Sequence, residues 1–218
     1  MRFMLASGND HKLREFRAIL RPFDVLPMPA GLALPPEGVE SFAANALDKA
    51  LSLARAVVAG AAPAAGADDL PGDLLFLADD SGLEVQALGW APGVTSARYA
   101  GVDGPGADRA NVARLLRELA GFAGPVARRA RFVCSVVAVT PRMAHYAATG
   151  YWWGAIDVAP RGEGGFGYDP VFIPQGSDLT VAQWPQELKD QASHRALAGT
   201  ALLERLCQEG VIGETGHS

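Results

Sequence analysis

The sequence has little cysteine, no excess of positive charge and no long apolar run, and each absence excludes a class of protein. Its two cysteines, Cys134 and Cys207, are too few and too far apart for a disulfide framework or a zinc site. A net charge of −5 argues against a protein that binds duplex DNA through a basic face. No run is apolar enough to cross a membrane, and the N-terminus lacks a signal-peptide pattern. We therefore expect a soluble, cytoplasmic protein that binds neither nucleic acid nor membranes.

Helix-like and strand-like segments alternate along the chain, and 49% of its residues are apolar, enough for a sizeable core. The pattern predicts strands at 2–6, 74–78, 83–88, 131–139 and 145–158, and helices at 10–20, 42–58, 108–119 and 193–207. This interleaving indicates an α/β fold with a mixed sheet. No composition break divides residues 1–218, so we expect one domain. We also expect Asn111 to face outward, 59–67 to be a surface loop, and the tail 210–218 to be frayed.

An acidic pair follows the apolar segment 74–78: Asp79 and Asp80, then Ser81 and Gly82. Two adjacent carboxylates at the end of a buried strand are electrostatically costly. A bound cation relieves that cost, and oxygen-only ligands favour Mg²⁺, Mn²⁺ or Ca²⁺ over zinc. A solvated Asp-Ser-Gly turn explains the same residues equally well.

Two further segments can contact phosphates. One joins the first strand to the first helix and consists of Ser7, Gly8, Asn9, Asp10, His11 and Lys12. Open N–H groups at a helix N-terminus bind anions, although a plain turn capped by Asn9 or Asp10 has the same composition. The other lies in the helix 42–58, where Asn45 and Lys49 are four residues apart and share one face. That face can reach a phosphate or the acidic pair, or it can simply be solvated.

A glycine-rich loop formally matches Gly-x-Gly-x-x-Gly at Gly162, Gly164 and Gly167. The dinucleotide motif requires a helix directly afterwards, which Pro170 and Pro174 forbid. A planar base suits the loop better. Its Phe166 can stack on the base and the following Asp169 can accept a hydrogen bond from base or ribose, unless Phe166 is buried in a tight turn.

Nearer the C-terminus, Lys189 is followed by Ser193, His194 and Arg195. Ser193 can cap the last helix, which places His194 and Arg195 in its first turn. Cations gain nothing from the helix dipole at that end, so this pair favours a functional role over a plain helix start.

Taken together and in this order, these segments resemble the family of inosine/xanthosine triphosphate pyrophosphatases from Ser7 to Arg195. The most specific matches are the run 78–101, the stretch Gly-Gly-Phe-Gly-Tyr-Asp-Pro and the triplet Ser-His-Arg. The resemblance implies an elongated mixed sheet with flanking helices and two lobes around a nucleotide cleft. It also implies a homodimer, a Mg²⁺ requirement, and hydrolysis of ITP, dITP or XTP to monophosphate and pyrophosphate.

The resemblance also assigns roles to residues. Asp80 matches the general base and a metal ligand, with Asp79 as the metal ligand beside it. The positions that match substrate-binding residues are Ser7, Gly8, Asn9, Asp10, His11, Lys12, Lys49, Ser81, Phe166, Gly167, Tyr168, Asp169, Lys189, His194 and Arg195. Among these, His194 and Arg195 would donate to the purine O6, an acceptor that adenine lacks.

One position departs from the family pattern. The family usually has glutamate before Asn-Ala, as a metal-binding carboxylate, and this chain has Ala44. We expect the metal to rest on Asp79 and Asp80, helped through water by Glu40 or Glu37. Two alternatives stay open: an enzyme for other nucleotides, and a nucleotide-binding protein that lost turnover with the missing carboxylate.

Overall fold

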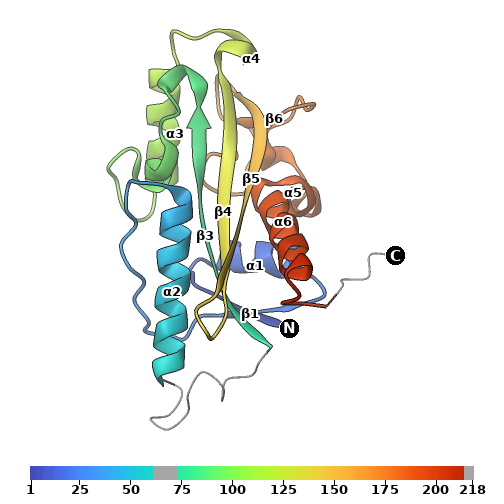
Figure 1. Cartoon of the computed structure of the whole chain (residues 1–218). Coiled ribbons are helices and arrows are strands. Elements are labelled where there is room, and N and C mark those ends of the chain that lie inside the picture. Colours follow the sequence, from blue (N-terminus) through green and yellow to red (C-terminus); the bar gives the residue numbers. More distant parts are fainter. Residues whose placement is uncertain (61–72, 214–218) are drawn as a thin grey trace. The chain divides into compact units, whose positions relative to one another are not determined.

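The chain forms a six-stranded mixed sheet with flanking helices, so the predicted α/β class is confirmed (Figure 1). The computed structural model describes residues 1–60 and 73–213, and the predicted surface loop 59–67 therefore lies largely outside the described residues. The strands are β1 (Arg2–Leu5), β2 (Asp24–Pro27), β3 (Leu74–Val85), β4 (Arg129–Val139), β5 (His145–Ile156) and β6 (Phe172–Pro174). Their order in the sheet is β2-β1-β3-β4-β5-β6. β1 runs parallel to β2 and β3, whereas β5 and β6 are antiparallel.

The α-helices are α1 (Asp10–Ile19), α2 (Phe42–Gly60), α3 (Ala107–Glu118), α4 (Gly124–Ala127), α5 (Gln186–Ala192) and α6 (His194–Gln208). Short 3₁₀ turns lie at Gln86–Leu88, Gly93–Arg98 and Val181–Gln183. No helix within the described residues is long and apolar enough to cross a membrane.

The chain divides into two compact units, each assembled from separated segments. The first comprises Met1–Asp80, Cys134–Gly150 and Arg195–Ser218, and the second comprises Ser81–Val133 and Tyr151–His194. The single domain expected from the sequence stays a prediction, because β3, β4 and β5 each contribute residues to both units.

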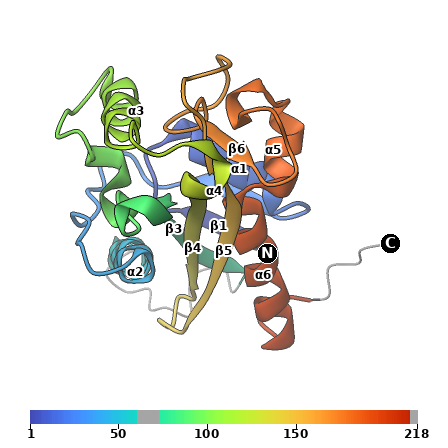
Figure 2. The same cartoon turned by 90° about the horizontal axis from the view of Figure 1, so that it is seen from above.

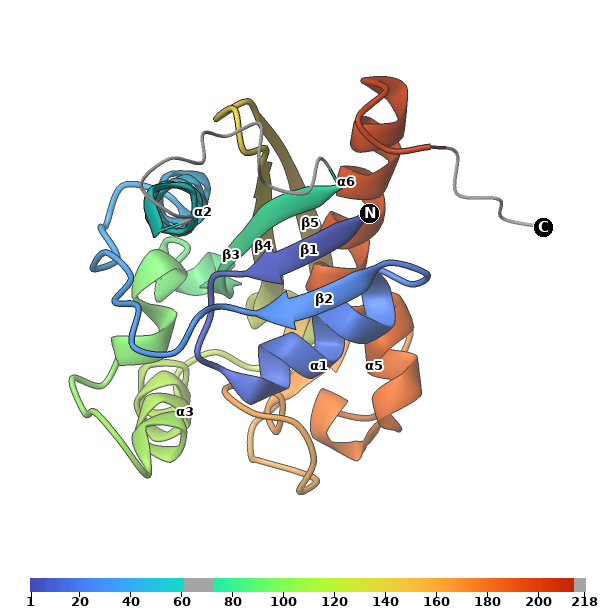
Figure 3. The ribbon, with the colours of Figure 1, turned by 90° about the horizontal axis from the view of Figure 1, so that it is seen from below.

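In the first unit, helices cover both faces of the sheet (Figures 1 and 2). Leu75 and Leu77 of β3 join one apolar cluster together with Phe16 of α1 and Leu202 of α6. Phe76 and the other even-numbered apolar residues of β3 join a second cluster, which contains Ala46, Ala50 and Leu53 of α2. Successive side chains of a strand point to opposite faces. The odd positions of β3 therefore face α1 and α6, and the even positions face α2. Figure 3 shows β1, β2 and β3 running in one direction, with α2 on one side and α6 on the other.

The second unit has its own core, built largely around aromatic side chains. Leu83 and Val85 of β3 pack there with Leu115 of α3, Trp152 of β5 and Phe172 of β6. Arg128 is also buried, and its guanidinium donates to the carbonyls of Leu119, Phe122, Ile156 and Asp157. These bonds tie the segment before β4 to the end of β5.

Four expectations need correction or completion. The strands predicted at 74–78 and 83–88 are one continuous strand up to Val85, followed by a 3₁₀ turn. The elements β2, β6, α4 and α5 had no prediction. Asn111, expected to face outward, is buried because it donates to the carbonyl of Ala97 and accepts from the amide of Ala100. In the tail expected to fray, Ile212 is buried in the first unit's core, and 214–218 lie outside the described residues.

The β5–β6 pairing generates a stability prediction. Gly154 lies opposite Pro174, and a Cβ at Gly154 would come within 2.2 Å of the Ile173 carbonyl oxygen. Backbone cannot yield cheaply, so Gly154→Ala should lower the free energy of unfolding by about 2 kcal/mol. The measurement is urea unfolding. Gly121→Ala is the matched control, because a Cβ there meets nothing within 4 Å. Equal urea midpoints for Gly154→Ala and Gly121→Ala would contradict the β5–β6 pairing.

Candidate functional site

Asp79 and Asp80 lie inside β3 rather than at its end, and both are buried, with 2% and 4% of their surface exposed. As neighbours in a strand they point to opposite faces of the sheet. Asp79 therefore faces α1 and α6, and Asp80 faces α2. The expectation that one ion rests on both carboxylates stays a prediction, and this geometry does not favour it.

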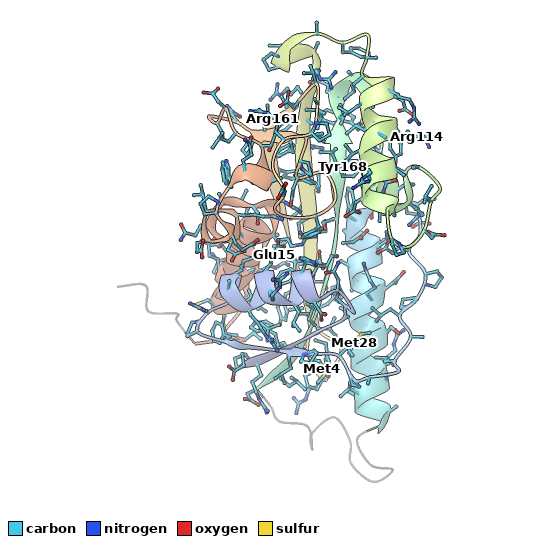
Figure 4. All side chains as sticks on the ribbon, turned by 180° about the vertical axis from the view of Figure 1, so that it is seen from behind. Met4, Glu15, Met28, Arg114, Arg161 and Tyr168 are labelled. Carbon is cyan, nitrogen blue, oxygen red and sulfur yellow. The ribbon has the colours of Figure 1, made fainter. Side chains whose placement is uncertain are left out.

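Asp79 is held by two cations. Lys12 Nζ of α1 lies 2.9 Å from Asp79 Oδ1, and Arg195 Nε of α6 lies 3.3 Å from Oδ2. Arg195 also places Nη1 at 3.0 Å from Oε2 of Glu15, a buried carboxylate of α1 that is labelled in Figure 4. Burial alone raises the pKa of Asp79, but Lys12, Arg195 and Lys49 outweigh it and hold this pKa well below the usual range. Asp79 is thus a permanent anion joining α1 to α6.

Asp80 has a different environment on the α2 face. Asn45 Nδ2 donates to Asp80 Oδ2 at 2.8 Å, and Lys49 Nζ lies 3.4 Å from Oδ1. Burial raises the pKa of Asp80 and the nearby Glu37 raises it further, against the lowering by Lys49 and Asn45; the net shift is upward. A carboxylate with a raised pKa is a better proton acceptor at neutral pH.

Lys49 connects Asp80 to a loop carboxylate. Its Nζ lies 2.8 Å from Glu37 Oε1. Burial lowers the pKa of Lys49, but Asp79, Asp80 and Glu37 together raise it above the ordinary value, so the side chain stays charged. Burial raises the pKa of Glu37, but the hydrogen bond and the charge of Lys49 outweigh it, so the net shift is downward. Within residues 1–60 and 73–213, no three acidic, histidine or cysteine side chains form a ready-made metal cage.

The loop before α1 is an ordered cap. Asn9 is the N-cap, and its Oδ1 accepts from the amides of His11 and Lys12 at 2.8 and 3.3 Å. Ser7 Oγ accepts from the amide of Asn9. Gly8, Asp10 and His11 are exposed, and a Cβ at Gly8 would meet nothing within 4 Å. Of the two capping alternatives Asn9 is correct, and this capped helix start presents Lys12 toward Asp79.

In the second unit, Asp169 organises the glycine-rich loop. Its Oδ2 accepts from Lys189 Nζ at 2.6 Å and from the amide of Phe166 at 2.9 Å. Gly165 adopts φ of +72°, and a Cβ there would lie 2.1 Å from Asp169 Oδ2. Because Asp169 is buried among these donors, it shapes the loop; the expectation that it accepts from base or ribose is not what this geometry favours.

Tyr168 and Gly167 anchor the same loop. The Tyr168 hydroxyl donates to the carbonyl of Ser96 at 2.8 Å, and burial raises its pKa (Figure 4). The amide of Gly167 donates to Asp108 of α3 at 2.8 Å. The Phe166 ring remains half-buried, with Lys189 Nζ 4.4 Å from its centre, and it lines a cavity of about 410 Å³. Phe166 is therefore the member of this loop that best suits stacking on a base.

His194 is held by aromatic stacking. Its ring lies 4.7 Å from that of Phe132 at an interplanar angle of 12°, and it also stacks on Trp152. Ser81 follows Asp80 in β3 and is half-buried.

The predicted residues thus fall into two groups. The first unit brings together Lys12, Lys49, Asp79, Asp80 and Arg195. The second brings together Phe166, Asp169 and Lys189. Sequence reasoning missed Glu15 and Asp108. Glu15 follows Lys12 by three residues on one helix face, which is a usable signal. Asp108 lies 59 residues from its partner, with no local signal.

The charge network predicts how stability depends on pH. The pKa of Asp79 is lower in the folded state than its unfolded value of about 3.9. Its contribution is therefore complete above that value and is lost as the pH falls through the folded pKa. Asp79→Asn leaves Arg195 and Lys12 without this anion and should cost about 3 kcal/mol at pH 7. The free energy of unfolding of this variant should also fall less steeply than that of the parent as the pH is lowered.

Urea unfolding between pH 2 and pH 7 measures both effects. The control is Asp73→Asn, which removes an exposed partner of Arg2 and should change little. An Asp79→Asn variant as stable as this control would contradict the network.

Comparisons with known proteins show the family and the fold of this chain. The Ham1 family model matches residues 3–205. A protein from Ralstonia nicotianae named dITP/XTP pyrophosphatase is 44% identical, with 94% of this chain and 96% of the relative covered. One of the same name from Methylococcus capsulatus is 42% identical, with the same coverage of both chains.

Solved structures are also similar. The Ham1 protein of Staphylococcus aureus has a TM-score of 0.75 and 34% identity, covering 96% of this chain and all of that one. A HAM1 protein from Coxiella burnetii has a TM-score of 0.77 and 32% identity, covering 95% of this chain and 99% of that one. With a family model matched from residue 3 to residue 205 and relatives similar over nearly their whole length, this chain belongs to the Ham1 family.

Proposed function

We propose that this chain hydrolyses deaminated purine nucleoside triphosphates (ITP, dITP and XTP) to the monophosphate and pyrophosphate, with Mg²⁺ as cofactor. The observation that carries the proposal is Asp80, a buried carboxylate with a raised pKa beside Lys49. The relatives named dITP/XTP pyrophosphatase support the choice of substrate. The homodimer and the cytoplasmic location that the resemblance implies belong to the same proposal.

The phosphate chemistry uses residues of the first unit. Lys12 and Lys49 bind the triphosphate oxygens with their ammonium groups, and the positive end of the α1 dipole also favours anions. A water oxygen attacks the α-phosphorus as the bond to the bridging oxygen breaks. Pyrophosphate leaves, and the water proton passes to Asp80. The oxygen donors near Asp80 fit Mg²⁺, which would neutralise charge that develops on the phosphoryl oxygens.

Base selection uses hydrogen-bond polarity. Hypoxanthine and xanthine carry an acceptor at O6, where adenine has a donor amine. His194 and Arg195 would donate hydrogen bonds to O6. With adenine they would face an amine that is itself a donor, and such a mismatch can lower kcat/KM roughly 10⁴-fold. Both side chains are already oriented, His194 by Phe132 and Arg195 by Glu15. Phe166 stacks on the base.

Product analysis tests the proposed reaction. Purified protein with Mg²⁺ is given ITP, XTP, GTP, ATP and dTTP in parallel. We expect IMP or XMP together with pyrophosphate, and ATP and dTTP nearly untouched, because the O6 acceptor is required. Released phosphate, or preference for a pyrimidine triphosphate, would point to a different enzyme. Tight ITP binding with no product would instead make the chain a binding protein.

A substitution tests the general base. Asp80→Asn keeps the size and the Asn45 and Lys49 neighbours but removes the proton acceptor, so kcat with ITP should fall about 10²- to 10⁴-fold. Asp24→Asn, on the exposed surface of β2, is the control and should keep the parent rate. A normal rate for Asp80→Asn would refute this role.

A further inference from the structure

A carboxylate holds the main chain on each side of the Phe166 ring. The amide of Phe166 donates to Asp169 Oδ2 at 2.9 Å, and the next amide, that of Gly167, donates to Asp108 Oδ2 at 2.8 Å. Asp169 belongs to the glycine-rich loop itself, and its own amide donates back to the Phe166 carbonyl at 3.2 Å. Asp108 lies on α3, 59 residues away in the sequence. The bond from Gly167 therefore ties the segment that carries the ring to a separate helix.

Asp108 lies in the first turn of α3 but bonds outside its own helix. The residue before α3 is Gly106, which has φ of +100° and no side chain that could cap the helix. An aspartate at a helix start is favoured by the dipole and often accepts from amides of its own first turn. Asp108 accepts instead from Gly167 of the glycine-rich loop. Its placement thus serves the loop rather than the start of α3.

The helix that carries Asp108 is itself firmly held in the second unit. Asn111 accepts from the amide of Ala100 at 2.7 Å and donates to the carbonyl of Ala97 at 3.0 Å. Leu115, one turn further along α3, is fully buried in the aromatic core. The carboxylate of Asp108 therefore projects from a fixed support, and its bond passes the position of α3 on to the loop.

The peptide next to Phe166 needs such a support. Gly167 has φ of +62°, and a Cβ there would meet nothing within 4 Å, so neighbouring atoms do not restrain it by crowding. Glycine has more backbone conformations open to it than any other residue. Hydrogen bonds must restrain it instead, and they come from Asp108 to its amide and from Tyr168, whose hydroxyl is bonded to the Ser96 carbonyl. A ring that is ordered before the ligand arrives saves the cost of ordering it on binding.

We propose that Asp108 is a positioning residue for the nucleotide base: by holding the Gly167 amide, it keeps the Phe166 ring in the orientation that stacks on the purine. Stacking uses the flat face that every base has and tolerates changes at its edge. Asp108 therefore strengthens the binding of all these nucleotides alike and leaves the choice between ITP and ATP to His194 and Arg195. This inference rests on the proposed function, because the purine nucleotide is the ligand proposed there.

Calorimetric titration with two ligands tests the role without requiring turnover: the α,β-imido analogue of ITP, and inorganic triphosphate, which has no base. Asp108→Ala should weaken binding of the analogue roughly five- to tenfold, because it removes a hydrogen bond to a charged acceptor. Inorganic triphosphate should bind as in the parent, since it uses Lys12 and Lys49. Asp108→Asn keeps an acceptor oxygen and should retain most of the affinity. Asp103→Ala removes an exposed carboxylate from the loop before α3 and is the matched control, with parent affinity for both ligands.

Steady-state kinetics give a second readout. Asp108→Ala should raise KM for ITP with little change in kcat, the pattern of binding lost equally from ground state and transition state, and the ratio of kcat/KM for ITP over ATP should stay constant. Equal affinity of Asp108→Ala and Asp103→Ala for the analogue would overturn the proposal. Equal losses for the analogue and for inorganic triphosphate would also overturn it, because they indicate a general disturbance of the fold. Failure of the proposed function would appear separately, as a parent chain that binds the analogue but does not hydrolyse ITP; a parent without affinity for the analogue would overturn both.

Discussion

Two carboxylates buried next to each other in one pleated strand are the constraint on which the rest of this structure depends. Left alone, Asp79 and Asp80 would repel each other and lose their hydration. Because successive side chains of a strand point to opposite faces, the pleat separates the two carboxylates, and cationic side chains lie next to each of them. Lys12 and Arg195 pair with Asp79, and Lys49 pairs with Asp80 while also lowering the pKa of Asp79. The three helices that flank β3 in the first unit are therefore fixed by charge as well as by apolar packing.

The two carboxylates differ in chemical character for the same reason. Asp79 has two strong cationic partners and a lowered pKa, so it acts as a fixed structural anion. Burial, together with the neighbouring Glu37, raises the pKa of Asp80 more than Lys49 and Asn45 lower it. The structural and the reactive roles are thus divided between adjacent residues.

Much of this could be predicted from the sequence, because motif and period are local signals. The α/β class, the helix of Asn45 and Lys49, and the cap before Lys12 all follow from such patterns. The path of β3 through Asp-Asp-Ser-Gly did not, since those residues favour a turn unless distant cations neutralise them. For Asp169 the sequence indicated an acceptor but not its donors, which are Lys189 and the backbone of its own loop.

The central claim is that Asp80 is the reactive carboxylate of the site and that Lys49 binds the phosphates beside it. The most direct measurement is anomalous scattering from Mn²⁺ in crystals grown with ITP in which an imido group replaces the oxygen between the α- and β-phosphorus atoms. The account predicts a Mn²⁺ peak bound by a carboxylate oxygen of Asp80, with Lys49 Nζ on the phosphates. A cation with no contact to Asp80, and Lys49 still between Glu37 and Asp80, would contradict it.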